Sequence, residues 1–560
     1  MKVSEIPYKR YEIEDLKKAL ETFREGTNAA TSAEQVFAAR KTFLDETTAY
    51  GTAVSLANCR FTLNTKDEFY INEMEYYDNV SPIASEVMVE YSEIMLSTPF
   101  RKELEKKVNP ICYKNYETAK KAYNPSVEKE CQTENAIVTE YSKFMSELGV
   151  EWNGEKLPLS VVRGYLEDED REVRKAAACA IGRALEENKD TLDDIYDRLV
   201  KIRTKIARKM GYKDFVELGY YRMNRIDYDR ATVEKFRKNV LEDLVPVVSE
   251  IKKETAKDLG IENMKFYDDA VYIKGGNPRP KDGAAGIFEN AQKMYDEMNP
   301  EIGKFMHSML ENEAFDVEPR DGKWGGGYCT GFDKYKQPFI LANFNGTAGD
   351  IDVITHEFGH AFAQKKVYDC GDAELGVGGM ETAECHSMSM EFFCEKYMDK
   401  FFDNPKDYCK AHLLSSVCFI PYGVIVDEFQ HIVYENPDMT PQERDEAYLS
   451  LEKKYRPYMD FEGIPYLEKG TRWQYQMHIY ESPFYYIDYC LAQTVALGFL
   501  VMMTENYDEA LKRYIKFASA GGTKLFSDLV KEAELPNPFG DGTLKTLSEK
   551  ILKIAKSYEN

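Results

Sequence analysis

Apolar residues recur at intervals of three and four along much of the chain, which is the spacing of one face of an α-helix. Four stretches with this pattern span residues 11–26, 32–50, 170–212 and 229–260. Few glycines or prolines interrupt them, and Ser32 followed by Gln35 is typical of a capping box at the start of the second stretch. The pattern predicts a mainly α fold.

The pattern changes between residues 267 and 350, where glycine and proline become frequent, as in "IKGGNPRPKDGAAG" at 273–286. Further on, "GGGYCTGF" at 325–332 and "QPFILANFN" at 337–345 are typical of two short strands around a turn. We therefore predict a small β-sheet directly before the next helical segment.

A chain of 560 residues is long enough for more than one domain. The polar stretch "NGEKLPLS" at residues 153–160 is the best candidate for a boundary. It would separate an N-terminal helical region, residues 1–160, from a second region, residues 161–560.

The charge of the chain limits its partners. The formal net charge is −24 and the isoelectric point is about 5.0, which opposes binding to nucleic acid and to anionic membranes. The first 20 residues carry charges where the apolar core of a signal peptide would lie, and the apolar run "TVALGFLVMM" is far shorter than the ~20 residues that span a bilayer. We expect a cytoplasmic protein without nucleic-acid or membrane partners.

The cysteines indicate neither a disulfide framework nor a cysteine metal site. There are eleven of them, an odd number, and none is separated from another by two residues. Most are expected to be small buried apolar residues.

The segment "ITHEFGHAFAQ" at residues 354–364 places two of the seven histidines four positions apart. In a helix, positions i and i+4 lie on one face, so His356 and His360 can bind one metal ion. Glu357 would flank that ion, where a carboxylate can take a proton from a water molecule on the metal. An apolar stripe of Ile354, Phe358 and Phe362 would bury the helix.

Two histidines leave a tetrahedral site in need of a third protein ligand. The metzincin arrangement is excluded because Ala363 and Lys366 stand where its glycine and third histidine would be. A carboxylate from a returning helix is the alternative, and the glycine-rich segment 370–379 allows the chain to reverse.

The returning helix would span residues 380–400 and carry Glu381, Glu384, His386 and Glu391. We select Glu384 as the ligand and Glu381 as the next choice. Spacing alone leaves Glu384 only modestly ahead of the others, although His386 should face elsewhere on the helix.

The segments "HEFGHAFAQ" and "METAECHSMSMEFF" resemble the oligoendopeptidase F and thimet oligopeptidase family of zinc peptidases, and most of all its shorter bacterial Pz-peptidase-like branch. The resemblance covers the chain from about residue 165. It implies an almost wholly helical, zincin-type ellipsoid with a deep substrate channel, in which Glu384 is the third zinc ligand. It also implies that short oligopeptides are the substrates.

The segment "QMHIYESPFYYIDYCLAQ" at 476–493 is similar to the part of that family that contributes a histidine and two tyrosines near the scissile bond. The matching residues are His478, Tyr486 and Tyr489. The thimet branch has a glycine-rich loop where this chain reads "YESP", so Tyr480 and Tyr485 remain alternatives.

These observations predict an endopeptidase with one zinc ion per chain and Glu357 as general base. Two rivals remain: an exopeptidase that uses an anchor such as Arg472, and a peptide-binding protein without activity on the same scaffold. The sequence does not indicate an oligomeric state.

Supporting roles are also predicted near the metal. Strand 338–345 could pair with an extended substrate, and "GGGY" at 325–328 could close over it or form a hairpin bend. Asp352, one turn before His356, could orient a ligand or a substrate amine, although a helix cap or a solvated acid is the simpler expectation. Glu381, Ser387 and Glu391 could hold the metal ligands in place.

Overall fold

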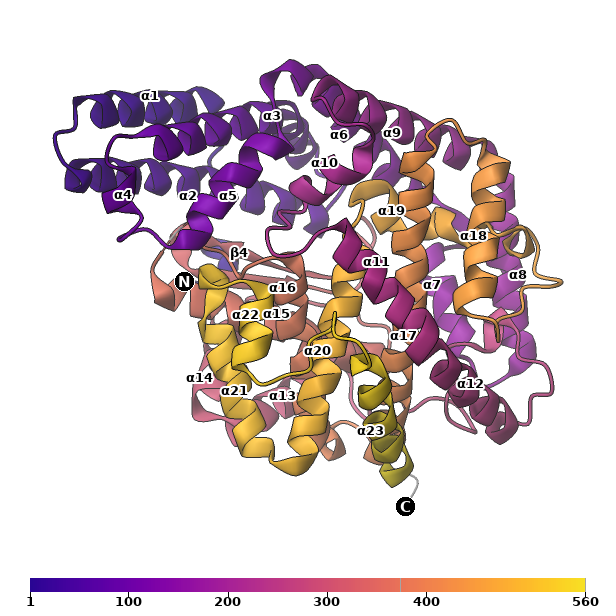
Figure 1. The fold of residues 1–560 in the computed structure, drawn as a ribbon. Coiled ribbons are helices and arrows are strands. Elements are labelled where there is room, and N and C mark those ends of the chain that lie inside the picture. The colour runs from indigo at the N-terminus through magenta and orange to yellow at the C-terminus, as the bar shows by residue number, and fades with distance from the viewer. Residues whose placement is uncertain (373, 559–560) are drawn as a thin grey trace.

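The computed structural model describes residues 1–372 and 374–558, and helices dominate it (Figure 1). The N-terminal helices are α1 (Ile13–Ala29), α2 (Ala33–Leu63), α3 (Glu68–Ser97), α4 (Arg101–Leu104), α5 (Pro110–Ala122) and α6 (Glu128–Glu147). The central helices are α7 (Leu159–Gly164), α8 (Arg171–Glu187), α9 (Lys189–Lys209), α10 (Phe215–Arg222), α11 (Arg230–Asn239), α12 (Val245–Leu259), α13 (Ala284–Met298) and α14 (Pro300–Glu311). The C-terminal helices are α15 (Gly349–Cys370), α16 (Met380–Cys394), α17 (Pro405–Glu435), α18 (Pro441–Tyr455), α19 (Met477–Glu481), α20 (Tyr486–Glu505), α21 (Tyr507–Ser519), α22 (Phe526–Glu532) and α23 (Thr543–Tyr558).

The predicted mainly α fold is confirmed, and two of the helical stretches differ in detail from the expectation. The capping box at Ser32 does not form: the Ser32 side chain makes no cap hydrogen bond, and the Gln35 side chain accepts from the backbone N–H of Thr31 at 2.6 Å. The stretch 229–260 contains a π-helical turn between α11 and α12. Pro246 lies just after that turn, where a proline cannot supply the N–H of a regular helix.

The polar stretch at 153–160 is part of a β-hairpin that the pattern analysis missed. Strand β1 (Gly149–Trp152) pairs antiparallel with β2 (Glu155–Pro158). Asn153 and Gly154 between them have φ of 52° and 85°, as a two-residue hairpin turn requires. The Asn-Gly pair at 153–154, which is typical of such a turn, could have indicated the hairpin. The domain boundary near residue 160 stays a prediction.

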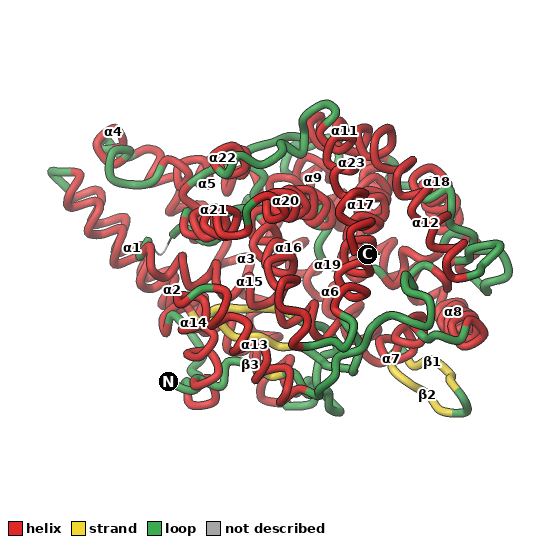
Figure 2. The backbone as a smooth tube through the Cα atoms, turned by 90° about the horizontal axis from the view of Figure 1, so that it is seen from below, coloured by secondary structure: helices red, strands yellow, loops and turns green. Residues whose placement is uncertain are grey.

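A second sheet lies directly before α15 (Figure 2), as predicted. Strand β4 (Tyr328–Phe332) pairs antiparallel with β5 (Gln337–Leu341), and the bend between them is at 333–336. The prediction that "GGGY" forms the hairpin bend is wrong, since residues 325–328 lead into β4, and its suggested closure over a substrate stays a prediction. The short strand β3 (Phe315–Asp316) pairs parallel with the other side of β5.

The parallel pairing with β3 bears on the expectation that the strand at 338–345 pairs with an extended substrate. β4 pairs with β5 along its whole length, and β3 occupies the other side of β5 at Ile340 and Leu341, so β5 cannot pair with a substrate at those two positions. Strand β4 is at the edge of the sheet and is the strand that can add a peptide backbone.

The core is built around three helices, α16, α17 and α20. Helix α16 packs between α15 and α20, and α17 packs on the other side of α20 (Figure 1). By length and composition, α17 and α20 could each cross a membrane, but 72% and 78% of their apolar windows are buried within the protein. Burial of that extent is what the central helices of a folded core show.

A second apolar cluster lies among α1–α5, seen as the arm of indigo and purple helices in Figure 1. Leu375, from the segment that joins α15 to α16, is buried in this cluster. Arg40 on α2 forms an ion pair with Glu374 in the same segment, and the Tyr116 hydroxyl donates to Glu374 at 2.7 Å. The N-terminal helices therefore hold the connection between the two helices that carry the metal site.

Candidate active site

Helix α15 presents the two histidines of the motif. Ile354, Phe358 and Phe362 are fully buried along one side of it, which confirms the predicted apolar stripe. His356 and His360 lie on another side with their ring centroids 5.0 Å apart. The buried apolar side fixes the position of the helix, and the two imidazoles on its other side lie close enough together to share one ligand.

A close approach of helix backbones brings the third ligand to this point. α15 ends at Cys370, its C-cap Gly371 has φ of 77°, and the chain returns as α16. A Cβ atom on Gly359 would lie 2.6 Å from the His386 carbonyl oxygen and 2.7 Å from Ser387 Cα. Only glycine permits this contact, and the contact places Glu384 beside the two imidazoles.

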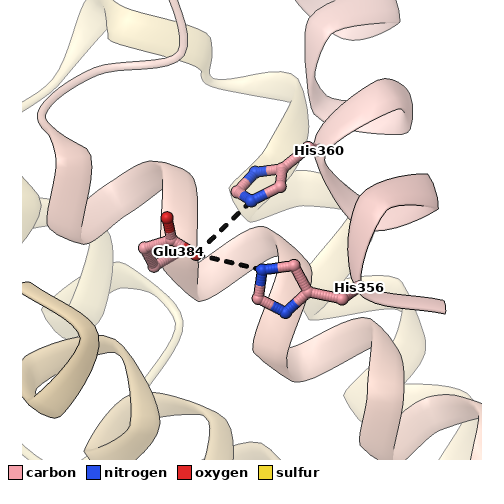
Figure 3. Close-up of side chains that lie close together, drawn as sticks. All are labelled: His356, His360 and Glu384. Carbon is pink, nitrogen blue, oxygen red and sulfur yellow. Dashed lines mark ion pairs between the residues drawn. The ribbon is translucent and has the colours of Figure 1, made fainter. Parts of the chain in front are cut away.

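The three side chains converge with the geometry of a metal site (Figure 3). Glu384 Oε2 is 3.3 Å from His356 Nε2 and 3.4 Å from His360 Nε2. Ligands ~2.0–2.1 Å from a tetrahedral zinc ion are ~3.3–3.4 Å apart, so these residues fit zinc. Two imidazoles and one carboxylate also leave the fourth position open, as catalytic zinc sites do.

A chain of hydrogen bonds supports His356 from behind. Its Nδ1 donates to Glu391 Oε1 at 2.6 Å, which leaves Nε2 free for a metal. Glu391 Oε2 accepts from His412 Nε2 at 2.8 Å, and His412 Nδ1 is 2.9 Å from Glu395 Oε1. Burial opposes the charge of His412, but hydrogen bonds to both carboxylates raise its pKa well above the ordinary value. Glu391 is therefore a support for a ligand.

Glu384 is held in a similar way. The Ser387 hydroxyl lies 3.0 Å from Glu384 Oε2, and the Tyr485 hydroxyl donates to Glu384 Oε1. Burial raises the pKa of Glu384, but the two histidines outweigh it and lower that pKa well below its usual range. The carboxylate is thus kept ionised, as a metal ligand must be.

Glu357 lies between the histidines in sequence and is 8% exposed. Its carboxylate makes no hydrogen bond within the described residues. Burial raises its pKa, and the charges of His356 and His360 oppose that rise. An unpaired carboxylate with a raised pKa beside a metal site is suited to accept and release a proton.

His478 and the predicted tyrosines form one aromatic group next to Glu384. The His478 ring centroid is 5.6, 5.0 and 5.7 Å from those of Tyr485, Tyr486 and Tyr489. Tyr485 contacts Glu384 directly, and the Tyr489 ring lies 4.9 Å from that of Tyr485. Burial raises the pKa of Tyr489, and the negative charges of Glu384 and Glu357 raise it further.

Tyr486 lies one layer further back. Its ring packs against Phe419 and Tyr422, with centroids 5.7 Å away in each case. Tyr480 is fully buried and stacks on Tyr141 at 3.9 Å, with its hydroxyl 3.5 Å from the Leu192 carbonyl oxygen. The structure thus places Tyr485 and Tyr489 nearest the metal ligands, and the catalytic roles of His478, Tyr486 and Tyr489 stay predictions.

Comparison with known proteins identifies the family. The model of the peptidase M3 N-terminal domain matches residues 3–123, and that of peptidase family M3 matches residues 164–279 and 288–549. The chain belongs to peptidase family M3. The predicted family, which is one of zinc metalloendopeptidases, is confirmed, and the similarity extends into the N-terminal helices, where the motifs gave no indication of it.

Individual relatives of this M3 peptidase agree with that assignment. Pz peptidase A, determined with an inhibitor, is 41% identical, covers 99% of both chains and superposes with a TM-score of 0.95. Oligopeptidase PepF of Bacillus subtilis is 24% identical over 69% of this chain and 58% of its own length. An oligoendopeptidase F homolog of Borreliella burgdorferi is 25% identical over 72% of this chain and 69% of its own. The M3 chain therefore matches less than two thirds of the B. subtilis protein.

Two other residues considered as ligands, Glu381 and His386, make no hydrogen bond to His356, His360 or Glu384 of the M3 peptidase within the described residues. Glu381 lies near Asp488 and 3.5 Å from the Tyr228 hydroxyl, and burial with the Asp488 charge raises its pKa to about 8. His386 is fully buried without a hydrogen-bond partner among the described residues, and burial lowers its pKa to about 3. Glu381 is thus not among the groups that support the ligands.

Asp352 is neither a cap nor a solvated acid, contrary to expectation. α15 begins at Gly349, and the Tyr408 hydroxyl donates to Asp352 Oδ1 at 2.5 Å. The Tyr408 ring is parallel to that of His412, with centroids 5.7 Å apart. Asp352 thereby belongs to the network behind His356, closer to the alternative that it orients a ligand; the sequence did not reveal the connection because Tyr408 and His412 come from α17.

This network leads to a prediction about zinc affinity. We expect Glu391→Gln to weaken zinc binding roughly 10–100-fold, because an amide orients the His356 imidazole less well than a carboxylate. Competition with a chelator of known affinity measures the change. Glu381→Gln, a buried acid on the same helix that contacts neither His356 nor His412, is the control. Equal zinc affinities for the two variants would contradict the proposed role of Glu391.

Proposed function

We propose that this M3 peptidase is an endopeptidase that hydrolyses internal peptide bonds of short oligopeptides. The observation that carries the proposal is the convergence of His356, His360 and Glu384, with Glu384 3.3 and 3.4 Å from the two imidazoles, and a Glu357 carboxylate beside them that has no hydrogen-bond partner in the described part of the chain. When bound there, zinc supplies a Lewis acid that polarises a carbonyl and makes water more acidic. The remaining chemistry belongs to side chains of the chain.

Glu357 is the group that moves the proton. It takes a proton from the attacking water and delivers it to the departing amine nitrogen, so the carboxylate is regenerated in each cycle. It is buried, and no group in the described part of the chain hydrogen-bonds to it, so both carboxylate oxygens are available for these transfers.

We assign the stabilisation of the oxygen that becomes negative to phenols and an imidazole. This assignment is supported by the contact of Tyr485 with Glu384 and by the position of His478 beside the rings of Tyr485 and Tyr489. Hydrogen bonds from fixed donors to a developing oxyanion commonly contribute 10²–10³-fold to a rate. The edge strand β4 can align the substrate backbone through main-chain hydrogen bonds, which favours broad side-chain preference.

Support for internal cleavage comes from the surroundings of Arg472. This residue was the candidate anchor for a peptide terminus, but its guanidinium stacks on Tyr422 at 3.9 Å and pairs with Glu452 at 3.7 Å. With that charge already engaged, an exopeptidase lacks its suggested anchor. A catalytically silent protein is disfavoured because the three ligands and Glu357 are all in place.

The decisive experiment uses peptides blocked at both ends. Incubation with the zinc-loaded protein followed by mass spectrometry should show products from internal bonds. Cleavage only of peptides with a free terminus would establish the exopeptidase alternative, and no cleavage across a varied peptide library would establish the silent one. We further propose a cytoplasmic location, on the basis of eleven cysteines that are all free thiols, as is usual in a reducing compartment.

A further inference from the structure

The hydrogen bonds around His478 indicate which of its ring nitrogens carries a proton. His478 lies on α19, and its Nδ1 is 2.9 Å from the Gln476 side-chain nitrogen, Nε2. An amide nitrogen can only donate, so Nδ1 must accept. The other ring nitrogen of His478 makes no hydrogen bond to any described residue.

The orientation of the Gln476 amide is set by a third residue, Tyr422 on α17. The Tyr422 hydroxyl donates to the Gln476 side-chain oxygen at 2.5 Å. If the amide were reversed, its nitrogen would face Tyr422, and the hydroxyl hydrogen of Tyr422 would have no acceptor in the described part of the chain. A buried donor without an acceptor costs about 1–3 kcal/mol, so the first arrangement is favoured.

Tyr422 is itself held in place. The Arg472 guanidinium lies over its ring at 3.9 Å, and Tyr486 meets the ring edge-on at 5.7 Å. Tyr422 is 8% exposed, so its hydroxyl has little access to water as an alternative partner. A fixed direction of donation therefore runs from Tyr422 through Gln476 to His478.

A histidine whose Nδ1 accepts must carry its proton on Nε2 when it is neutral. Burial among the three phenols lowers the pKa of His478 to about 4, although the Glu384 charge opposes that change. His478 is thus neutral near pH 7, and its single N–H is on the ring nitrogen that has no hydrogen-bond partner among residues 1–372 and 374–558.

We propose that Tyr422 and Gln476 are positioning residues that hold His478 as the neutral tautomer with its proton on Nε2. His478 then acts as a fixed hydrogen-bond donor to the substrate oxygen, and it does not accept a proton during the reaction. The purpose of this arrangement rests on the proposed peptidase function. The tautomer is a property of the folded protein and can be measured without a substrate.

The first test is ¹⁵N NMR of the zinc-loaded protein labelled at histidine. The chain has seven histidines, and a His478→Asn variant assigns the signals of His478. Near pH 7 we expect a protonated Nε2 and an unprotonated Nδ1. A protonated Nδ1 in the wild-type protein would overturn the inference.

The second test reverses the hydrogen bond. Gln476→Glu replaces the donor with an acceptor, so the proton should move to Nδ1 in the NMR spectrum. We expect kcat to fall roughly 10–100-fold with a smaller change in KM, because the donor to the transition state is lost. Gln442→Glu makes the same substitution at an exposed position of α18 and should leave spectrum and rate unchanged. A Gln476→Glu variant with the wild-type tautomer and rate would refute the assignment.

Tyr422→Phe provides a variant without added charge in case Gln476→Glu fails to fold. Loss of the hydroxyl frees the amide to reverse, so signals of both His478 tautomers are expected. A single, wild-type tautomer in this variant would contradict the role of Tyr422. If the wild-type protein shows the expected tautomer but cleaves no peptide, the proposed function fails and the tautomer assignment stands. If it cleaves peptides but Nδ1 of His478 is protonated, the proposed function stands and the tautomer assignment fails.

Discussion

Glu357→Gln should reduce kcat for peptide hydrolysis by about 10²–10⁴-fold or more while leaving zinc bound. The amide has the shape of the carboxylate but cannot accept the proton of the attacking water. Because Glu357 is not a ligand and makes no hydrogen bond within the described residues, the metal site should persist. Steady-state kinetics together with metal analysis of the same preparation measure both quantities.

The same variant makes a prediction about stability. Burial raises the pKa of Glu357, which means that its ionised form is disfavoured in the folded protein. Glutamine removes that cost, so we expect a melting temperature no lower than that of the wild type. Glu254→Gln, at an exposed position of α12, is the matched control and should retain full activity. A Glu357→Gln variant with near wild-type kcat would remove Glu357 from the mechanism.

Glu384→Ala has the second large effect, and it acts through the metal. Loss of one of three protein ligands should weaken zinc binding more than the roughly 10–100-fold expected for a residue that only supports a ligand. It also leaves the hydroxyl of Tyr485 without its acceptor. Dialysis against a weak chelator should therefore remove zinc from this variant but not from the wild type, and activity should be lost with the metal.

Thermal unfolding provides an independent readout. Zinc that binds the folded state raises the melting temperature, and this rise should vanish in Glu384→Ala. Glu381→Gln is the control, since Glu381 lies one turn away on α16, is similarly buried and points to Asp488. If Glu381→Gln lost zinc and Glu384→Ala retained it, the choice of third ligand would be wrong.

The metal ligands were predictable because the residues that indicate them lie close together in the sequence. His356 and His360 are one turn apart on one helix, and the glycine-rich segment between residues 370 and 379 signals a reversal of the chain. Spacing narrowed the third ligand to four candidates on the returning helix, and the family resemblance supported Glu384. The structure adds that Gly359, which has no side chain, lets α16 approach α15 closely enough for Glu384 to reach the two histidines.

The parts that could not be predicted depend on contacts between distant segments. His412 reaches Glu391 from α17, and nothing near position 412 marks it as part of a metal site. The central position of β5 follows from its pairing with the two-residue strand β3, which is too short to give an alternating pattern. Tyr485 and Glu384 are 101 residues apart in the sequence, so no local pattern indicates their contact. The family motif instead matched the neighbouring residues Tyr486 and Tyr489.

The central claim is that two imidazoles and the Glu384 carboxylate bind one catalytic zinc ion. Anomalous diffraction at the zinc absorption edge from crystals of the zinc-loaded protein tests it most directly. We predict one strong anomalous peak per chain at about 2.0–2.2 Å from Nε2 of His356, Nε2 of His360 and an oxygen of Glu384. A peak located elsewhere, or bound without Glu384, would contradict the account.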